Sequence, residues 1–145
     1  MVSSTPHQGQ HGYLLDSGIF ITARRRGLDL DELVKRDPHL TYGMSAITAA
    51  ELLIGVDLAT PGRRAMRQQM VEDYFADFAV LDFDIPCARR WARLASAVHS
   101  QGLLIGAHDL LIAATALHHN FAVITYNTRK FSRVPGLTVI PPSGT

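Results

Sequence analysis

Short apolar runs and longer amphipathic segments alternate along the chain. The apolar runs are typical of buried strands, and they predict strands at residues 13–16, 41–46, 79–84, 121–125 and 137–140. Apolar residues three or four positions apart predict helices at about 19–25, 29–36, 48–58, 63–77, 86–100 and 107–118. Strands that alternate with helices favour a single α/β domain in which a central parallel sheet carries helices on both faces.

Length and composition narrow the class of protein. The 145 residues suit one domain, and 47% apolar with 19% charged residues excludes a disordered chain. The polar residues 1–11 are predicted to be a disordered tail ahead of a domain over 12–145. No apolar run is long enough to span a bilayer, no signal peptide is evident, and the single cysteine excludes an intrachain disulfide. We therefore expect a cytoplasmic protein without a membrane segment.

Four polar side chains fall where a parallel sheet of this kind binds ligands. Asp16 ends the first predicted strand and Asn127 follows the fourth. Glu51 lies early in the helix after the second strand, and Asp109 lies early in the helix before the fourth. Ligands of open α/β sheets bind beyond the carboxyl ends of the strands. We therefore expect these four side chains to meet at one edge.

Each of the three acids also has an ordinary structural interpretation. Asp16 suits the N-cap of the helix that follows it, and Glu51 suits a capping box opened by Thr48. Asp109 in a first helical turn would complement the helix dipole, an effect of about 0.3–1 kcal/mol. Read separately, these interpretations are at least as well supported as a functional role.

The three acids read together favour a metal site. They lie in strongly apolar segments, where an unpaired buried carboxylate costs several kcal/mol. No Lys or Arg lies within six residues of Glu51 or Asp109, so the partner is either a cation brought from elsewhere in the fold or a metal ion. Carboxylates without nearby His or Cys suit Mg²⁺ or Mn²⁺ rather than zinc.

Basic residues could hold a polyanion next to such a site. Residues 85–145 contain six Lys or Arg and one carboxylate, Asp109. Arg129, Lys130 and Arg133 follow Asn127 directly, which favours a role beside the acids. The other basic groups are Arg24, Arg25 and Arg26, and also Arg89, Arg90 and Arg93, for which a solvated helix face is the better interpretation.

Two other groups with possible chemistry are interpreted as structural. His118 and His119 are adjacent in sequence, so we expect them on different faces of their helix and not as ligands of one metal. Cys87 is expected to be a small core residue of the preceding helix.

Four segments in order resemble the PIN-domain ribonucleases, specifically the VapC toxins of VapBC toxin–antitoxin pairs. They are Leu-Leu-Asp-Ser-Gly at 14–18, Ser-Ala-Ile-Thr-Ala-Ala-Glu-Leu at 45–52, Ile-Gly-Ala-His-Asp-Leu-Leu-Ile-Ala-Ala at 105–114 and Ile-Thr-Tyr-Asn-Thr-Arg-Lys-Phe at 124–131. The resemblance covers about residues 13–140. It implies a PIN-like domain with a Mg²⁺-dependent endoribonuclease site, in which Mn²⁺ can substitute.

The resemblance also implies roles for individual residues. Asp16, Glu51 and Asp109 match the family's three most regular acidic positions, as metal ligands, and Asn127 matches the fourth. Ser17 and Thr125 match hydroxyl positions that support the site, and Arg129 and Lys130 are expected to steer RNA. The chain departs from the family at Gly18, which supplies no side-chain ligand, and at Lys130, where an acid is common. Three strong carboxylates remain, which weakens the case for a second metal.

The function implied is a toxin that cleaves tRNA or ribosomal RNA with a metal-activated water. A VapB-like antitoxin and a homodimer are the implied protein partners. One alternative is a PIN-like RNA-binding or scaffold domain whose site has degraded. A second is a flavodoxin-like or response-regulator-like domain, which would normally place two adjacent acids after the first strand and a Lys after the last, and neither feature is evident.

Overall fold

The computed structural model describes residues 10–34 and 36–143. Five parallel strands form one sheet in the order β3-β2-β1-β4-β5. The strands are β1 (Gly12–Leu15), β2 (Thr41–Ser45), β3 (Ala79–Leu81), β4 (Phe121–Ile124) and β5 (Val139–Ile140). The predicted α/β class and the parallel sheet are confirmed.

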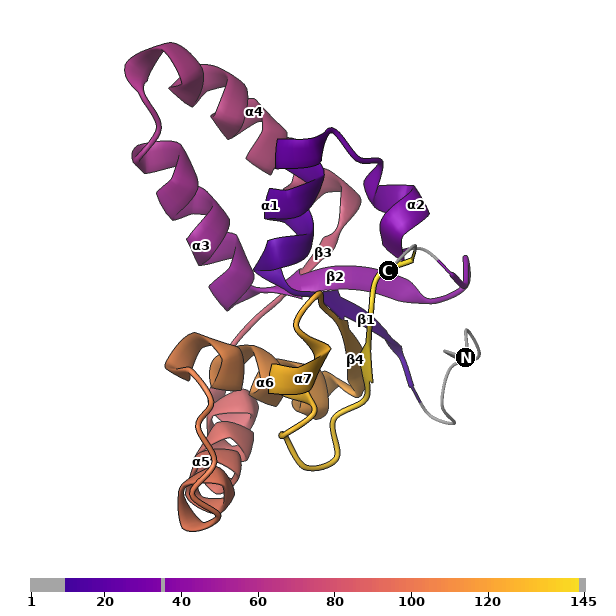
Figure 1. Ribbon diagram of the computed structural model, residues 1–145, viewed down its shortest axis with the longest axis vertical. Coiled ribbons are helices and arrows are strands. Elements are labelled where there is room, and N and C mark those ends of the chain that lie inside the picture. Colours follow the sequence, from indigo (N-terminus) through magenta and orange to yellow (C-terminus); the bar gives the residue numbers. More distant parts are fainter. Residues whose placement is uncertain (1–9, 35, 144–145) are drawn as a thin grey trace.

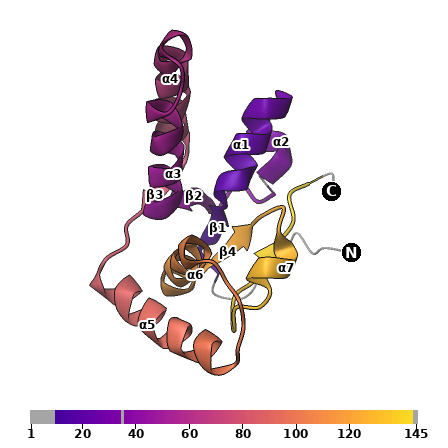
Figure 2. The same cartoon turned by 60° about the vertical axis from the view of Figure 1, so that its left-hand side comes forward.

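Helices cover both faces of the sheet, as predicted (Figure 1). They are α1 (Ser17–Arg26), α2 (Leu30–Val34), α3 (Ala46–Asp57), α4 (Pro61–Asp77), α5 (Ile85–Ser100), α6 (Ala107–His119) and α7 (Thr128–Phe131). Helices α1 to α4 pack on one face and α5 to α7 on the other. Figure 2 shows α3 and α4 side by side, on the opposite side of the sheet from α5.

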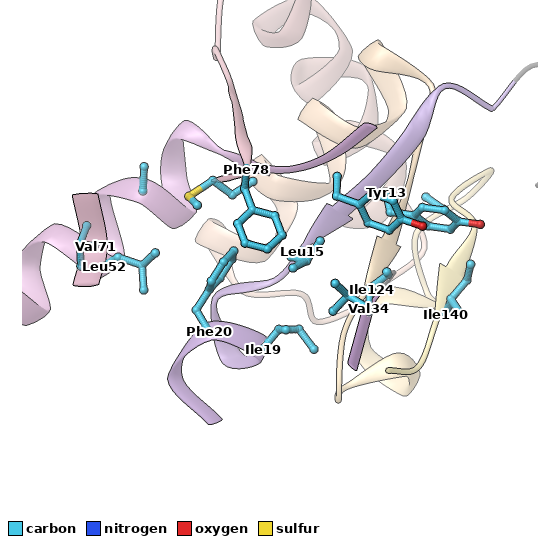
Figure 3. Packing of buried hydrophobic residues seen from close by; sticks show 14 of the residues in the cluster. Tyr13, Leu15, Ile19, Phe20, Val34, Leu52, Val71, Phe78, Ile124 and Ile140 are labelled. Carbon is cyan, nitrogen blue, oxygen red and sulfur yellow. The ribbon is translucent and has the colours of Figure 1, made fainter. Parts of the chain in front are cut away.

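The strands divide their side chains between two buried clusters because successive residues point to opposite faces. Tyr13 and Leu15 of β1 join the cluster beneath α1 to α4, whereas Leu14 joins the cluster beneath α5 and α6. In the first cluster Phe20 meets Phe78 edge to face, with ring centroids 5.4 Å apart (Figure 3). The aromatic residues at the end of α4 therefore pack in or against the core.

Two predicted boundaries are wrong for reasons of capping. Helix α3 begins at Ala46 rather than Thr48, because the side chain of Ser45 accepts a hydrogen bond from the Thr48 amide at 3.0 Å. Strand β3 ends at Leu81 rather than at Asp84, because Asp84 leaves the sheet to cap α5 and accepts a hydrogen bond from the Cys87 amide at 3.1 Å.

Smaller differences lie at the chain's short elements. Helix α2 ends at Val34, β5 is two residues long, and α7 was not predicted. Of the predicted N-terminal tail, residues 1–9 lie outside the described residues, and the amide of His11 bonds to the Asn120 carbonyl at 2.9 Å. Within the described part of the chain, none of the helices has both the length and the apolar character needed to cross a membrane.

Candidate active site

The three predicted acids converge beyond the carboxyl ends of the strands. Asp16 directly follows β1, Glu51 lies on α3 after β2, and Asp109 lies in the first turn of α6, which leads into β4. Burial is the main cause of the raised pKa of Asp16 and of Glu51, and the charge of Asp109 raises both further, as the charge of Asp16 does for Glu51. The parallel sheet therefore brings together carboxylates that are up to 93 positions apart in sequence.

Asp16 is held by two hydrogen bonds. Its Oδ1 accepts from the Ser17 amide at 2.9 Å, so the predicted N-cap role is real. Its Oδ2 accepts from the hydroxyl of Thr125 at 3.0 Å, and that hydroxyl accepts from the Asn127 amide at 3.0 Å. Thr125 is completely buried. It therefore fixes the carboxylate of Asp16 relative to the loop that carries Asn127.

Asn127 starts a short helix that sequence reasoning missed. Its Oδ1 accepts from the Lys130 amide at 3.2 Å and so caps α7. This turn brings the ammonium of Lys130 to 2.9 Å from Oδ2 of Asp109. Asp109 therefore has a cationic partner from elsewhere in the fold, which was the alternative that the sequence left open.

Glu51 has no such partner for one of its oxygens. The capping-box interpretation is wrong, because Ser45 caps α3 and Glu51 lies beyond the first turn. Oε1 is buried and lacks a hydrogen-bond partner in the described structure. Burial raises the pKa of Glu51, and the charge of His108 and a hydrogen bond from Ser17 oppose this. An orphaned buried carboxylate oxygen costs free energy and calls for a further ligand.

The raised pKa of Asp16 also indicates that a cation is needed at this site. Burial raises its pKa above the ordinary value, although the hydrogen bond from Thr125 and the charge of Lys130 work against this shift. Within the described residues one lysine pairs with one of three clustered acids. The donor set is all oxygen, which suits Mg²⁺ or Mn²⁺. The residue types present therefore suit a hard divalent cation, and because the donor oxygens of Asp16, Glu51 and Asp109 do not all lie within 4.8 Å of one another, the side chains would have to draw together around it.

Two residues beside the acids were not predicted to belong to the site. His108 lies near enough for its charge to be the main influence that lowers the pKa of Glu51. At Gly106 an added Cβ would lie 3.0 Å from Oδ2 of Asp109, so a side chain there would crowd this carboxylate. Position 106 thus leaves room for Asp109, a constraint that neither spacing nor composition reveals.

A cavity of about 270 Å³ opens on the α1, α3 and α4 side of Glu51. Arg24, Arg25 and Arg67 line it together with Glu51 and apolar residues of these helices. Burial lowers the pKa of Arg24, and the charges of Arg67 and Arg25 lower it further. Three guanidinium groups that repel one another favour an anionic occupant. Arg67 was not predicted because only the packing of α4 against α3, where Arg67 donates to the Gly55 carbonyl at 3.2 Å, brings it here.

The fold and site define a class of α/β domain that carries acids at the carboxyl edge of a parallel sheet, and comparison with known proteins identifies its family. The PIN domain profile matches residues 13–137. The chain therefore belongs to the PIN-domain family, and its resemblance to the VapC toxins is confirmed. Ribonuclease VapC1 of Rickettsia felis is 33% identical over 136 residues, which cover 91% of this chain and 97% of the relative.

Solved structures give the same grouping. VapBC2 from Rickettsia felis, bound to a DNA fragment from their promoter, matches with a TM-score of 0.79 and 26% identity. That match covers 90% of this chain and 98% of the other. VapBC-5 of Mycobacterium tuberculosis, a member of the VapBC family of toxin–antitoxin systems, matches with a TM-score of 0.68 and 32% identity over 90% of this chain and 97% of the other.

Proposed function

We propose that this protein is the ribonuclease toxin of a toxin–antitoxin pair and that it hydrolyses RNA phosphodiesters with the help of a divalent cation. The observation that carries the proposal is the cluster of Asp16, Glu51 and Asp109, in which a buried oxygen of Glu51 lacks a partner. The name of the relative, Ribonuclease VapC1, supports cleavage of RNA as the reaction. The substrates we propose are tRNA or ribosomal RNA.

The three carboxylates are the proposed ligands of the cation, which we take to be Mg²⁺, with Mn²⁺ able to replace it. When bound, such an ion lowers the pKa of a coordinated water and neutralises charge on the reacting phosphate. Thr125 positions Asp16 through the 3.0 Å hydrogen bond to Oδ2. Ser17 steadies the same loop, because its amide donates to Oδ1 of Asp16.

Asn127 and the two basic residues after it act on the substrate side. We assign Asn127 the role of orienting a water molecule at the site, since the Thr125 hydroxyl accepts a hydrogen bond from its backbone N–H and so holds this loop next to Asp16. Lys130 competes with the cation for Asp109, because both positive charges need the same carboxylate. Arg129 is exposed on α7 and, with Lys130, supplies positive charge to the RNA backbone.

The arginine-lined cavity beside Glu51 is the proposed path of the RNA strand. Arg24, Arg25 and Arg67 gather positive charge next to the acids. A polyanion held there would bring a phosphodiester to the carboxylate cluster despite the negative charge of the cluster itself.

We also propose a VapB-like antitoxin as the protein partner and a homodimer as the assembly. The solved relatives named VapBC2 and VapBC-5 support the first part of this proposal. Size-exclusion chromatography with light scattering on the isolated chain, and again after co-expression with a candidate VapB-like antitoxin, measures both assemblies.

One observation favours a second candidate, a degraded PIN-like RNA-binding or scaffold domain. The ammonium of Lys130 lies 2.9 Å from Asp109 and already neutralises one of the three acids. In that case the protein would bind RNA without cutting it, and a divalent cation would leave its thermal stability unchanged.

The deciding experiment uses antitoxin-free protein and a mixed pool of tRNA and ribosomal RNA. Cleavage is compared in Mg²⁺, in Mn²⁺ and with EDTA, with Asp109→Asn run alongside. Discrete fragments that need the metal and disappear in the variant support the nuclease. Intact RNA, together with no metal-induced rise in melting temperature, would support the degraded domain instead.

A further inference from the structure

A second group of side chains able to bind a metal lies at the opposite end of α6 from the acids. Cys87 is buried in the first turn of α5, and His118 and His119 end α6. One donor atom of each lies within 4.8 Å of the other two. The expectation that the two histidines point to different faces is wrong, because their rings meet edge to face with centroids 4.9 Å apart.

The distances suit a zinc ion. Zinc bonds thiolate sulfur at about 2.3 Å and imidazole nitrogen at about 2.0–2.1 Å, so a tetrahedral arrangement separates the two donors by about 3.6 Å. Sγ of Cys87 lies 3.9 Å from Nε2 of His119. The pair of Cys87 and His119 is therefore close to the tetrahedral separation, and the donor of His118, which lies within 4.8 Å of both, would have to move closer by rotation of its side chain. We propose that Cys87, His118 and His119 form a zinc-binding site, with water as the fourth ligand.

Neighbouring groups fix the backbone of Cys87 and the ring of His119 beside this group. The Cys87 amide donates to Oδ1 of Asp84 at 3.1 Å, and its thiol points toward the Asp82 carbonyl, 3.6 Å away. His119 packs edge to face on Phe121, with ring centroids 6.3 Å apart. The ring contact limits the freedom of His119, whereas burial raises the pKa of the Cys87 thiol, so zinc binding would have to release the thiol proton together with its hydrogen bond to Asp82.

The two metal sites would select different ions. Asp109 and His119 are ten residues apart on one helix, which corresponds to about 15 Å along its axis. The acids offer only oxygen ligands. This group offers sulfur and nitrogen ligands, which bind zinc in preference to magnesium. Zinc here would fasten the start of α5 to the end of α6 (Figure 1) without supplying the cation for RNA cleavage.

The test uses full-length protein without a histidine tag, stripped with EDTA and titrated with Co²⁺ as a spectroscopic probe. We expect a thiolate-to-cobalt charge-transfer band that saturates at one equivalent and disappears when Zn²⁺ is added. Because Cys87 is the only cysteine in the chain, any such band reports on this site. Zn²⁺ should also raise the melting temperature.

Variants separate this site from the acids and from adventitious binding. Cys87→Ser should lose the charge-transfer band, and both Cys87→Ser and His119→Gln should lose the rise in melting temperature with Zn²⁺. Asp109→Asn in the acid cluster and His99→Gln, an exposed histidine of α5, should keep both. A wild-type protein that shows no charge-transfer band overturns the proposal, as does a band that saturates at half an equivalent, which would mean a zinc shared between two chains. Circular dichroism of each variant verifies that it is folded.

Discussion

The two ends of α6 carry opposite kinds of chemistry. At its first turn Asp109 joins two other carboxylates, which form an all-oxygen donor set, and it pairs with the ammonium of Lys130. At its last turn His118 and His119 meet a buried thiol, a set of nitrogen and sulfur donors that is neutral when the histidines are unprotonated. The polarity of the helix matches both ends, because acids are favoured at the N-terminus and histidines at the C-terminus.

The difference shows how one helix can serve two purposes. The acid end needs an outside cation, since Oε1 of Glu51 is buried without a partner. At the other end the Cys87 amide already donates to Asp84 and the Cys87 thiol to the Asp82 carbonyl, so a metal there would add stability rather than complete an unsatisfied group. We therefore expect changes at the acid end to govern cleavage and changes at the histidine end to govern stability. Single substitutions at the two ends test that division, and the largest effect is expected on cleavage.

The largest effect is expected at the acid end. Asp109→Asn should lower RNA cleavage by more than about a hundredfold, because removal of a direct ligand costs at least as much as removal of the groups that orient ligands. Asp73→Asn, an exposed acid of α4, is the matched control and should cleave normally. Initial rates on the preferred RNA measure both. If Asp109→Asn kept near wild-type activity, this acid would not be a ligand.

Replacing Lys130 should change metal affinity by less than Asp109→Asn changes cleavage. Lys130→Met removes the charge that competes for Asp109, and a partly exposed ion pair is worth about 0.2–1 kcal/mol, so Mn²⁺ should bind up to about fivefold more tightly. RNA should bind more weakly at the same time. Isothermal titration of the two variants Lys130→Met and Arg129→Met measures the contrast. Equal metal affinity in both would mean that Lys130 does not compete for the site.

The pH dependence of stability reports on Glu51 in metal-free protein. Burial raises the folded-state pKa of Glu51, so its protonated form is favoured in the folded state. The associated stability is complete below the ordinary carboxyl pKa of about 4.3 and is lost as pH rises through the raised value. In Glu51→Gln the side chain does not ionise, so this loss of stability with rising pH is absent. In EDTA, the free energy of unfolding of the variant should rise relative to that of wild type as pH increases across this range. A difference between the two proteins that does not change with pH would contradict this prediction.

The smallest effect on cleavage is expected at the histidine end. Cys87→Ser should cleave RNA within about twofold of wild type, because its site is about 15 Å along α6 from Asp109 and shares no partner with it. Rates are measured at a temperature where both proteins are folded. A large loss of cleavage in folded Cys87→Ser would show that the two ends of α6 are coupled.

The sequence by itself determined the α/β class, the parallel sheet and the positions of the acids. Apolar runs and helical spacing are local properties, and the carboxyl ends of parallel strands always share an edge. These rules place Asp16, Glu51 and Asp109 near one another without any knowledge of the contacts between them.

Only the tertiary structure decided which groups pair. Capping by Ser45 moved the start of α3 and left Glu51 without the amide that the capping box would have given it. The α7 turn brought Lys130 to Asp109, and the packing of α5 on α6 brought Cys87 to the histidines. Such pairings depend on distances of a few ångströms between residues far apart in the chain, and no periodicity in the sequence encodes those distances.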